Sequence, residues 1–250
     1  MDFSYSEEEQ MVIEMSDAYA ARWLGDYRTY ETAGCIPDAV RGAFIDSGLS
    51  LLAADAEDFS EISPPARCAV LAKLAASDAA STLALWMRSA LPVMASRLGI
   101  PDDQAQGLVG IQIVDALSEV THLPCVALDG SDRVLLLERS GAWTVSRVES
   151  QATHALALHA AGPVRCTTIE HLAEGNDPEA ARSVIADLRG TIAALLVGIG
   201  DGVQRYVAAY MQTRKTFGKT LNQHQGLAFI FADMAMATAG AEILLHKAVS

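Results

Sequence analysis

The chain has 250 residues, of which 51% are hydrophobic and 20% are charged, and its formal net charge is −13. This length and composition allow one large domain or two smaller ones with a sizeable core, and they argue against disorder. The acidic balance argues against a nucleic-acid-binding protein, because binding to phosphates requires a basic surface.

The sequence shows no sign of export or of a membrane span. No run of 18 apolar residues without a charge occurs, and the acidic beginning "MDFSYSEEEQ" does not resemble a targeting signal. The cysteines are widely spaced and form no C-x-x-C pair, so neither a zinc site nor a disulfide framework is indicated. We therefore expect a cytoplasmic protein with reduced thiols, no membrane span and no metal.

Residues 1–104 are predicted to form a helical domain. Ser6 and Glu9 fit a capping box at the start of a first helix. Pro37 is placed to open a second helix that ends near Gly48. Two more helices are expected between Pro64 and residue 99, where a glycine is suited to end a helix.

Residues 105–173 change character and predict a small antiparallel β domain. The segments "GLVGIQIVDALSEV", "CVALDG", "RVLLLERSG", "AWTVSRVES" and "ALALHAAGPVRC" are short and separated by turn signals. The sequences "LDGSDR" and "ERSGAW" are typical of hairpin connections. Strands of ordinary length would number about five or six in this region.

Residues 174–250 are predicted to be helical again. Asn176 or Asp177 is expected to cap a helix whose first turn contains Pro178. A connector over residues 213–222 contains Gly218 as a helix breaker, and a second helix follows. The expected fold is mainly α with a small β domain, made of an N-terminal helical domain, a shortened β domain and the start of a C-terminal helical bundle.

Three sequence features look like functional sites but do not meet their requirements. "VGIGDGV" contains Gly198, Gly200 and Gly202 but has Val203 where a dinucleotide-binding loop needs its last glycine. Close packing of a neighbouring backbone explains these glycines better. A pair of histidines, His154 and His159, has the wrong spacing for one helix face, so no metal is expected. No G-x-S-x-G nucleophile motif occurs.

Positive charge is concentrated in the connector "QTRKTFGKTLNQHQ", which contains Arg214, Lys215 and Lys219. Taken alone, these residues could serve a helix dipole or form a solvated face. The longer string "YMQTRKTFGKTLNQHQGLAFIFADMAM" resembles the signature of the acyl-CoA dehydrogenase family. The positions in register with that signature are Tyr210, Arg214, Phe217, Gly218, Leu221, Gln225, Phe231, Ala232, Asp233 and Met234.

Further similarity supports this resemblance. "FSYSEEEQMV" is similar to the opening of the family, and "ALSEV" is similar to its A-(M/L)-(T/S)-E-P motif. The order of helices, β domain and helices is also that of the family. The segment that continues the family's β domain is missing after this motif, and a hairpin that would line the flavin has no equivalent.

The resemblance implies FAD as cofactor and acyl-CoA as substrate. In this family the R-x-x-F-G segment reaches the FAD of a neighbouring subunit, so the residues implied to bind FAD are Arg214, Thr216, Phe217, His224 and Gln225, with Ser118 as a remaining contact to the flavin ring. A pyrophosphate is well matched by a planar, bidentate arginine. Arg189 corresponds to an arginine near the acyl-CoA end of the site, and a salt bridge to Asp187 or Glu179 is the alternative for it.

The catalytic residue is not identified by the resemblance. The family removes an α-proton with a Glu, which most members place beyond the position that matches residue 250 and some place where Leu188 stands here. We therefore expect a subunit of an FAD-dependent acyl-CoA dehydrogenase that relies on another chain for this Glu, in a homo- or hetero-oligomer. A non-catalytic partner at the FAD interface and a flavin monooxygenase on the same fold are the alternatives.

Overall fold

The N-terminal part of the chain is helical, as expected. The computed structural model describes residues 4–33, 35–55, 59–105, 107–117, 122–126, 133–152 and 163–250. Its first helices are α1 (Glu7–Trp23), α2 (Tyr27–Ala33), α3 (Asp38–Asp46), α4 (Leu49–Ala53), α5 (Pro64–Arg97) and α6 (Asp102–Ala105). The capping box of α1 is confirmed, since the Glu9 N–H donates to Ser6 Oγ and the Ser6 N–H donates to the Glu9 carboxylate. Helix α2 was not predicted from the sequence.

The two helices expected between Pro64 and residue 99 form one long, kinked helix, α5. Asp78 has non-helical dihedral angles inside it (φ −153°, ψ 101°). Its carboxylate accepts hydrogen bonds from the N–H groups of Ala80 and Ser81, as an N-cap residue does. The second half of α5 therefore begins as a helix with its own N-cap, Asp78.

The β domain is a five-stranded mixed sheet. Its strands are β1 (Leu108–Val114), β2 (His122–Val126), β3 (Arg133–Glu138), β4 (Ala142–Ala152) and β5 (Pro163–Asn176), in the spatial order β1-β3-β4-β5-β2. The turn at "ERSGAW" is confirmed, because β3 and β4 pair antiparallel across it. The expected hairpin between β2 and β3 is wrong. Strand β2 lies at the far edge beside β5, and β1 pairs with β3 in parallel, so the sheet is not wholly antiparallel.

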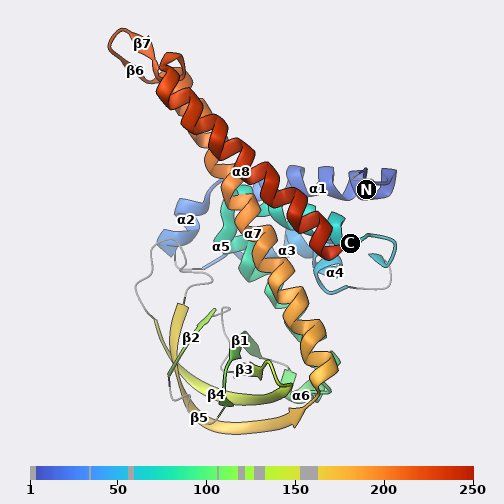
Figure 1. Ribbon diagram of the computed structural model, residues 1–250. Coiled ribbons are helices and arrows are strands. Elements are labelled where there is room, and N and C mark those ends of the chain that lie inside the picture. Colours follow the sequence, from blue (N-terminus) through green and yellow to red (C-terminus); the bar gives the residue numbers. More distant parts are fainter. Residues whose placement is uncertain are drawn as a thin grey trace.

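The C-terminal part is a long helical hairpin that projects from the rest of the protein (Figure 1). Its elements are α7 (Pro178–Thr213), β6 (Lys215–Thr216), β7 (Lys219–Thr220), the 3-10 helix η3 (Leu221–Gln223) and α8 (Gln225–Val249). The sequence predicted Asn176 or Asp177 as the N-cap of α7. Asp177 is the N-cap, and its carboxylate accepts hydrogen bonds from the N–H groups of Glu179 and Ala180. The fold class is confirmed, and the domain boundaries at 1–104, 105–173 and 174–250 stay a prediction.

The glycines of "VGIGDGV" serve helix packing. A Cβ on Gly198 would lie 2.3 Å from the carbonyl oxygen of Ala72, and one on Gly202 would lie 2.3 Å from that of Ala76. Both carbonyls belong to α5, which packs along α7. Gly200 faces the other way, where a Cβ would lie 3.2 Å from Thr238 Oγ1 on α8. These glycines therefore allow α5 and α8 to approach α7 closely. All three lie inside the helix α7 and do not form a dinucleotide-binding loop.

Within the described ranges, three helices, α5, α7 and α8, are long and apolar enough to cross a membrane as judged by length and composition alone. Helices α5 and α7 bury much of their apolar surface within the protein. In α8, none of the apolar window is buried, and Leu245 is the one residue of that helix that is. The expectation of no membrane span stays a prediction.

Candidate functional site

The connector between α7 and α8 forms a small hairpin at the far end of the projection (Figure 1). Lys215 pairs with Thr220, and Thr216 pairs with Lys219. The two residues of the turn both have positive φ, +52° for Phe217 and +79° for Gly218. Two such residues are what a tight primed hairpin turn requires, and glycine adopts this conformation without the steric penalty that phenylalanine incurs. The hairpin holds the Phe217 side chain 98% exposed.

Hydrogen bonds hold this tip hairpin, residues 214–224, to its base. His224 Nε2 lies 3.1 Å from the carbonyl oxygen of Thr216 and 3.3 Å from Thr216 Oγ1. The N–H of Leu221 donates to the carbonyl of Arg214 at 3.0 Å. Thr216 and His224 are therefore positioned by each other, eight residues apart in the chain.

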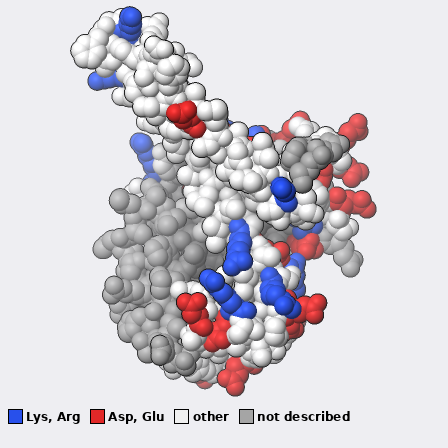
Figure 2. All heavy atoms as spheres, in the orientation of Figure 1, with Lys and Arg blue, Asp and Glu red and all other residues white. Residues whose placement is uncertain are grey.

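All of the charged side chains of the tip hairpin are positive. Arg214, Lys215 and Lys219 are all exposed, and residues 213–225 contain no Asp or Glu. Figure 2 shows Lys and Arg side chains at the far end of the projection, beyond a surface that is mostly uncharged. In a chain with a net charge of −13, this arrangement favours an anionic ligand at the tip.

The predicted site residues divide into three groups. The five residues predicted around the connector lie at the tip or next to it, namely Arg214, Thr216, Phe217, His224 and Gln225. Arg189 lies on α7, 25 positions before Arg214, so the helical rise separates the two by roughly 37 Å. Ser118 lies outside the described residues.

Arg189 does not form the salt bridge to Asp187 or Glu179 that was the alternative to a role in substrate binding. Asp187 forms its ion pair with Arg97 on α5. Among the described residues, Arg189 has no ion pair, and its side chain is exposed. Next to it, Leu188 is 7% exposed and contributes to the hydrophobic core. The position at which some family members carry the catalytic Glu is therefore an apolar, buried one here.

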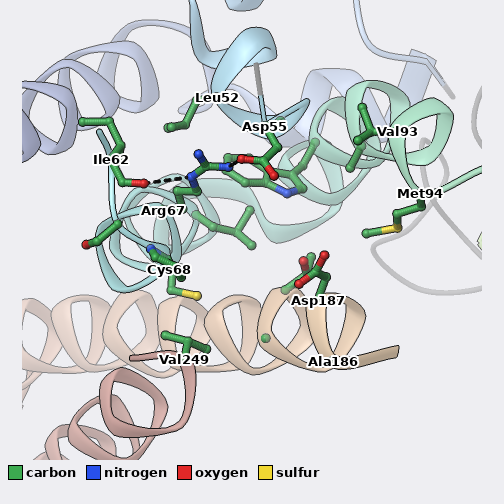
Figure 3. A pocket seen from close by; sticks show the side chains of 18 of the residues that line it. Leu52, Asp55, Ile62, Arg67, Cys68, Val93, Met94, Ala186, Asp187 and Val249 are labelled. Carbon is green, nitrogen blue, oxygen red and sulfur yellow. Dashed lines mark hydrogen bonds and ion pairs between the residues drawn. The ribbon is translucent and has the colours of Figure 1, made fainter. Parts of the chain in front are cut away.

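A pocket of about 570 Å³ lies where α4, α5, α7 and the end of α8 meet (Figure 3). Apolar side chains and four charged side chains line this pocket. The sequence did not predict the pocket. The apolar part includes Leu52, Leu71, Trp86, Val93 and Met94. A cavity of this size is in the range that holds small ligands.

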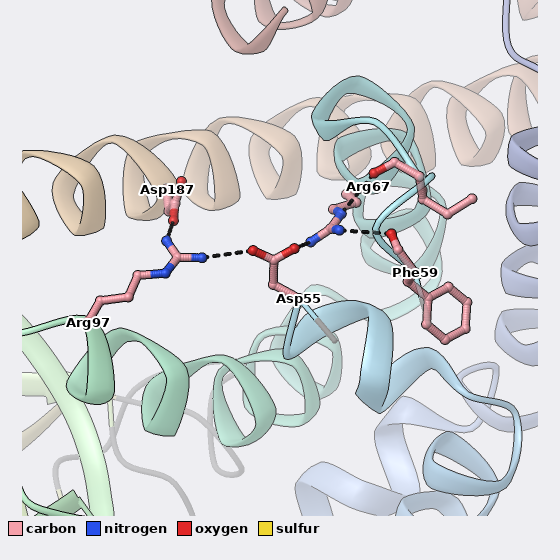
Figure 4. Close-up of polar contacts among 6 residues, drawn as sticks. Asp55, Phe59, Arg67, Arg97 and Asp187 are labelled. Atoms are coloured by element: carbon pink, nitrogen blue, oxygen red, sulfur yellow. Dashed lines mark hydrogen bonds and ion pairs between the residues drawn. The ribbon is translucent and has the colours of Figure 1, made fainter. Parts of the chain in front are cut away.

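The four charged residues of this pocket form one continuous chain (Figure 4). Asp55 pairs with Arg67 through one oxygen and with Arg97 through the other, at 2.9 Å for the second pair. Arg97 continues to Asp187 on α7. Arg67 also donates to the carbonyl oxygens of Phe59 and Ile62. The charges cancel, so this cluster fastens α7 to the N-terminal helices and leaves no unbalanced charge for a ligand.

The sequence held no local signal for this cluster, because its partners are 12, 42 and 90 residues apart. The thiol of Cys68 also lines the pocket. Burial, and secondarily the charge of Asp187, raises the pKa of Cys68 to about 11. Reactive cysteines have a lowered pKa, so this one is suited to packing rather than to nucleophilic attack.

Metal binding finds no support in the part of the chain that the structure describes, where no cluster of His, Cys, Asp and Glu could hold an ion. His154 and His159 lie outside the described residues. The tip hairpin is thus the leading candidate site.

Comparison with known sequences identifies the C-terminal part. Residues 179–250 match the family model described as "Acyl-CoA dehydrogenase, C-terminal domain". A short-chain specific acyl-CoA dehydrogenase of Clostridium acetobutylicum is 46% identical over 57 residues. That match covers 23% of this chain and 15% of the relative, so the matched segment is a small part of the relative's length.

Comparison with solved structures extends the likeness to the whole fold. The complex of glutaryl-coenzyme A dehydrogenase with glutaryl-CoA has a TM-score of 0.74 at 18% identity, covering 100% of this chain and 78% of that one. PigA with FAD and proline has a TM-score of 0.69 at 12% identity, covering 99% and 77%. Residues 179–250 are thus similar to the C-terminal domain of acyl-CoA dehydrogenases, and the whole chain shares the fold of these solved structures.

Proposed function

We propose that this chain is a subunit of an FAD-dependent acyl-CoA dehydrogenase and that its tip hairpin binds the pyrophosphate of an FAD held by a neighbouring subunit. The observation that carries the proposal is the concentration of Arg214, Lys215 and Lys219 on a projecting hairpin without acidic residues. The match of residues 179–250 to the family's C-terminal domain includes this hairpin.

The residues of the tip fit the anionic part of FAD. Arg214 carries a planar guanidinium that donates two parallel hydrogen bonds to a phosphate, and the two lysines add positive potential. Thr216 and His224, which hold each other, place a hydroxyl and an imidazole on the same small hairpin. The exposed ring of Phe217 offers an apolar surface beside these polar groups.

FAD, when bound, supplies the acceptor for the hydride that leaves the β-carbon of an acyl thioester. The contribution of this chain's described residues is binding and orientation at the cofactor. Arg189, exposed on α7 at the other end of the hairpin, is proposed to bind the acyl-CoA.

Proton removal from the α-carbon is assigned to a carboxylate of another chain. A general base must be within hydrogen-bond reach of that proton, and Leu188 provides neither charge nor access. The same observation favours a second candidate function, a non-catalytic subunit that lends Arg214 to the FAD of a complete partner.

Spectroscopy of the purified protein tests the proposal. We expect flavin absorbance to accompany the protein in its native complex and to bleach when acyl-CoA is added without oxygen. A native complex that contains no flavin, and that gains none when FAD is added, would contradict the proposed function.

Native mass spectrometry of the same complex separates the two candidates. A second polypeptide is expected of both candidates, so the number of FAD molecules separates them. One FAD for each pair of unlike chains would support the non-catalytic role, and one FAD for each chain would support a subunit with its own FAD. A complex of identical chains that bleaches with acyl-CoA would show that a copy of this chain supplies the base, and the assignment to a different chain would then be wrong.

A further inference from the structure

The two ends of helix α5 lie close together. Arg67, near its start, and Arg97, at its end, both form an ion pair with Asp55 (Figure 4). In a straight helix these two arginines would be separated by about 45 Å. The kink at Asp78 therefore folds α5 back on itself, into a first arm before Asp78 and a second arm after it.

The pocket of about 570 Å³ lies between these two arms. Both arms contribute to its wall, together with α4 and α7 (Figure 3). Buried apolar side chains from these elements form much of the wall, namely Leu52, Leu71, Trp86 and Met94. Arg67 and Arg97 add two guanidinium groups to it. An apolar wall with a few converging polar groups is typical of a site for a small molecule.

Asp55 lies between the two arginines and offers each of them one carboxylate oxygen. Its side chain is 45% exposed, and its backbone has the left-handed φ of +55°, which is uncommon for a residue other than glycine. Both arginines are also held without it. Arg67 donates to two backbone carbonyl groups, and Arg97 pairs with Asp187. The guanidinium groups would therefore keep their places if Asp55 turned away.

We propose that the pocket between the arms of α5 binds a monocarboxylate with an apolar tail, and that Asp55 occupies the carboxylate position when no ligand is bound. The carboxylate of the ligand pairs with Arg67 and Arg97, whose planar guanidinium groups match its geometry. The tail lies among the apolar side chains of the wall. Because the ligand replaces one carboxylate by another, the charges of the cluster stay balanced.

This carboxylate site is separate from the places proposed for FAD and acyl-CoA. The tip hairpin lies at the far end of α7 (Figure 1). Arg189 does not line the pocket, although Asp187 and Gly190 on either side of it do. An inorganic anion would leave the apolar wall unused, and a neutral apolar molecule would leave Asp55 in place. Binding of a monocarboxylate here depends neither on FAD nor on a second chain.

Calorimetric titration of the full chain with octanoate tests the site. Octanoate should bind, whereas octanamide, which has no charge, and acetate, which has no tail, should each bind at least about 10-fold more weakly. Trp86 lies on the wall, so binding should shift the tryptophan fluorescence, and Trp86→Phe should remove most of that shift. No binding at millimolar octanoate, equal affinity for octanamide, or a full shift in Trp86→Phe would contradict the proposal.

Removal of Asp55 should strengthen binding, which a purely structural role of this residue would not do. Asp55→Ala and Asp55→Asn should each lower the dissociation constant for octanoate about 3-fold or more, because the ligand no longer competes with an internal carboxylate. Asp201→Ala is the matched control, since it removes the same charge from a pair with Arg205 elsewhere on α7 and should leave the affinity unchanged. If the Asp55 variants bound octanoate no more tightly than this control, the proposal would be wrong.

Two arginine variants locate the bound carboxylate. Arg97→Gln should raise the dissociation constant for octanoate at least about 10-fold, and Arg189→Ala should leave it unchanged. An equal loss of affinity in both variants would place octanoate at the proposed acyl-CoA site and overturn the assignment to the pocket. Circular dichroism checks that each variant is folded, and Asp55→Asn decides the outcome should Arg97→Gln fail to fold. All titrations use protein without added FAD, so their outcome is independent of the cofactor proposal.

Discussion

Gly198 on α7 lies against the carbonyl oxygen of Ala72 on α5, so closely that a Cβ would be 2.3 Å from that oxygen. Gly202, one turn later on α7, lies equally close to the carbonyl oxygen of Ala76. The crossing of the two longest helices therefore depends on the absence of a side chain. Since the neighbouring atom is backbone, it cannot move aside as the end of a flexible side chain would.

Gly198→Ala is expected to lower the free energy of unfolding by about 1–3 kcal/mol, as overpacking does in well-packed cores. Urea denaturation followed by circular dichroism measures the change. Gly42→Ala in α3 is the control, because nothing lies within 4 Å of its Cβ position. The control should be stabilised by up to about 1 kcal/mol through helix propensity alone. Similar changes in both variants would show that the contact with Ala72 is unimportant.

The sequence was most informative where the signal is local. The capping box of Ser6 and Glu9, the cap at Asp177 and the helix break at Gly218 each depend on residues within a few positions, and all are present. The sheet order depends on contacts between distant segments, so the parallel pairing of β1 with β3 was missed.

The candidate site shows the same division. The candidate residues of the tip were predicted because they form one gapless motif, whereas the cluster around Arg97 was not predicted, since Asp55 and Asp187 are 42 and 90 residues away from it. No periodicity or spacing connects such residues before the chain folds.

Arg97→Ala is expected to lower the free energy of unfolding by about 1 kcal/mol. Arg97 joins two carboxylates that are both nearly half exposed, so solvent screening limits the value of each ion pair. The loss should shrink as salt is raised, because salt screens charges near the surface. Urea denaturation at low and high salt measures both effects.

Arg205→Ala is the control for the Arg97 cluster. It removes a single exposed pair with Asp201 on α7, which should be worth less than about 0.5 kcal/mol. If Arg97→Ala cost no more than this control, the chain of charges would not fasten α7 to the N-terminal helices.

Glu9 should make stability depend on pH. Burial opposes the ionised form, but hydrogen bonds from Ser63 and Ser6 outweigh it, so the pKa of Glu9 lies below the ordinary value of 4.5. The stabilisation is therefore fully present above the ordinary pKa and is lost as the pH falls through the lowered one.

Glu9→Gln is the test of this pH dependence, because it keeps a hydrogen-bond acceptor without an ionisable group. At neutral pH we expect the free energy of unfolding of this variant to be about 1–2 kcal/mol below that of the unsubstituted chain. This difference in the free energy of unfolding should become smaller toward about pH 3. Unfolding in urea across this range gives the comparison. A constant difference at all pH values would mean that the charge of Glu9 contributes nothing.

Arg214→Ala is expected to weaken the binding of FAD to the native complex without unfolding the chain. Arg214 is exposed at the tip and forms no ion pair with a described residue, so its removal should leave stability nearly unchanged. The substitution removes a bidentate, charge-assisted contact with a phosphate, worth about 1.5–3 kcal/mol. The FAD dissociation constant should rise roughly 10- to 150-fold, as measured by the quenching of flavin fluorescence.

Arg205→Ala provides the matched comparison for FAD binding as well. Arg205 lies on the same helix, nine residues before Arg214, and its charge is already paired with Asp201. Its replacement removes one cation from α7 and leaves the tip hairpin intact, so FAD affinity should change little. Arg214→Lys should fall between the two, because an ammonium group keeps the charge but cannot form the parallel pair of hydrogen bonds. If Arg214→Ala bound FAD as tightly as Arg205→Ala does, the positive charge of the tip would have to serve another anion.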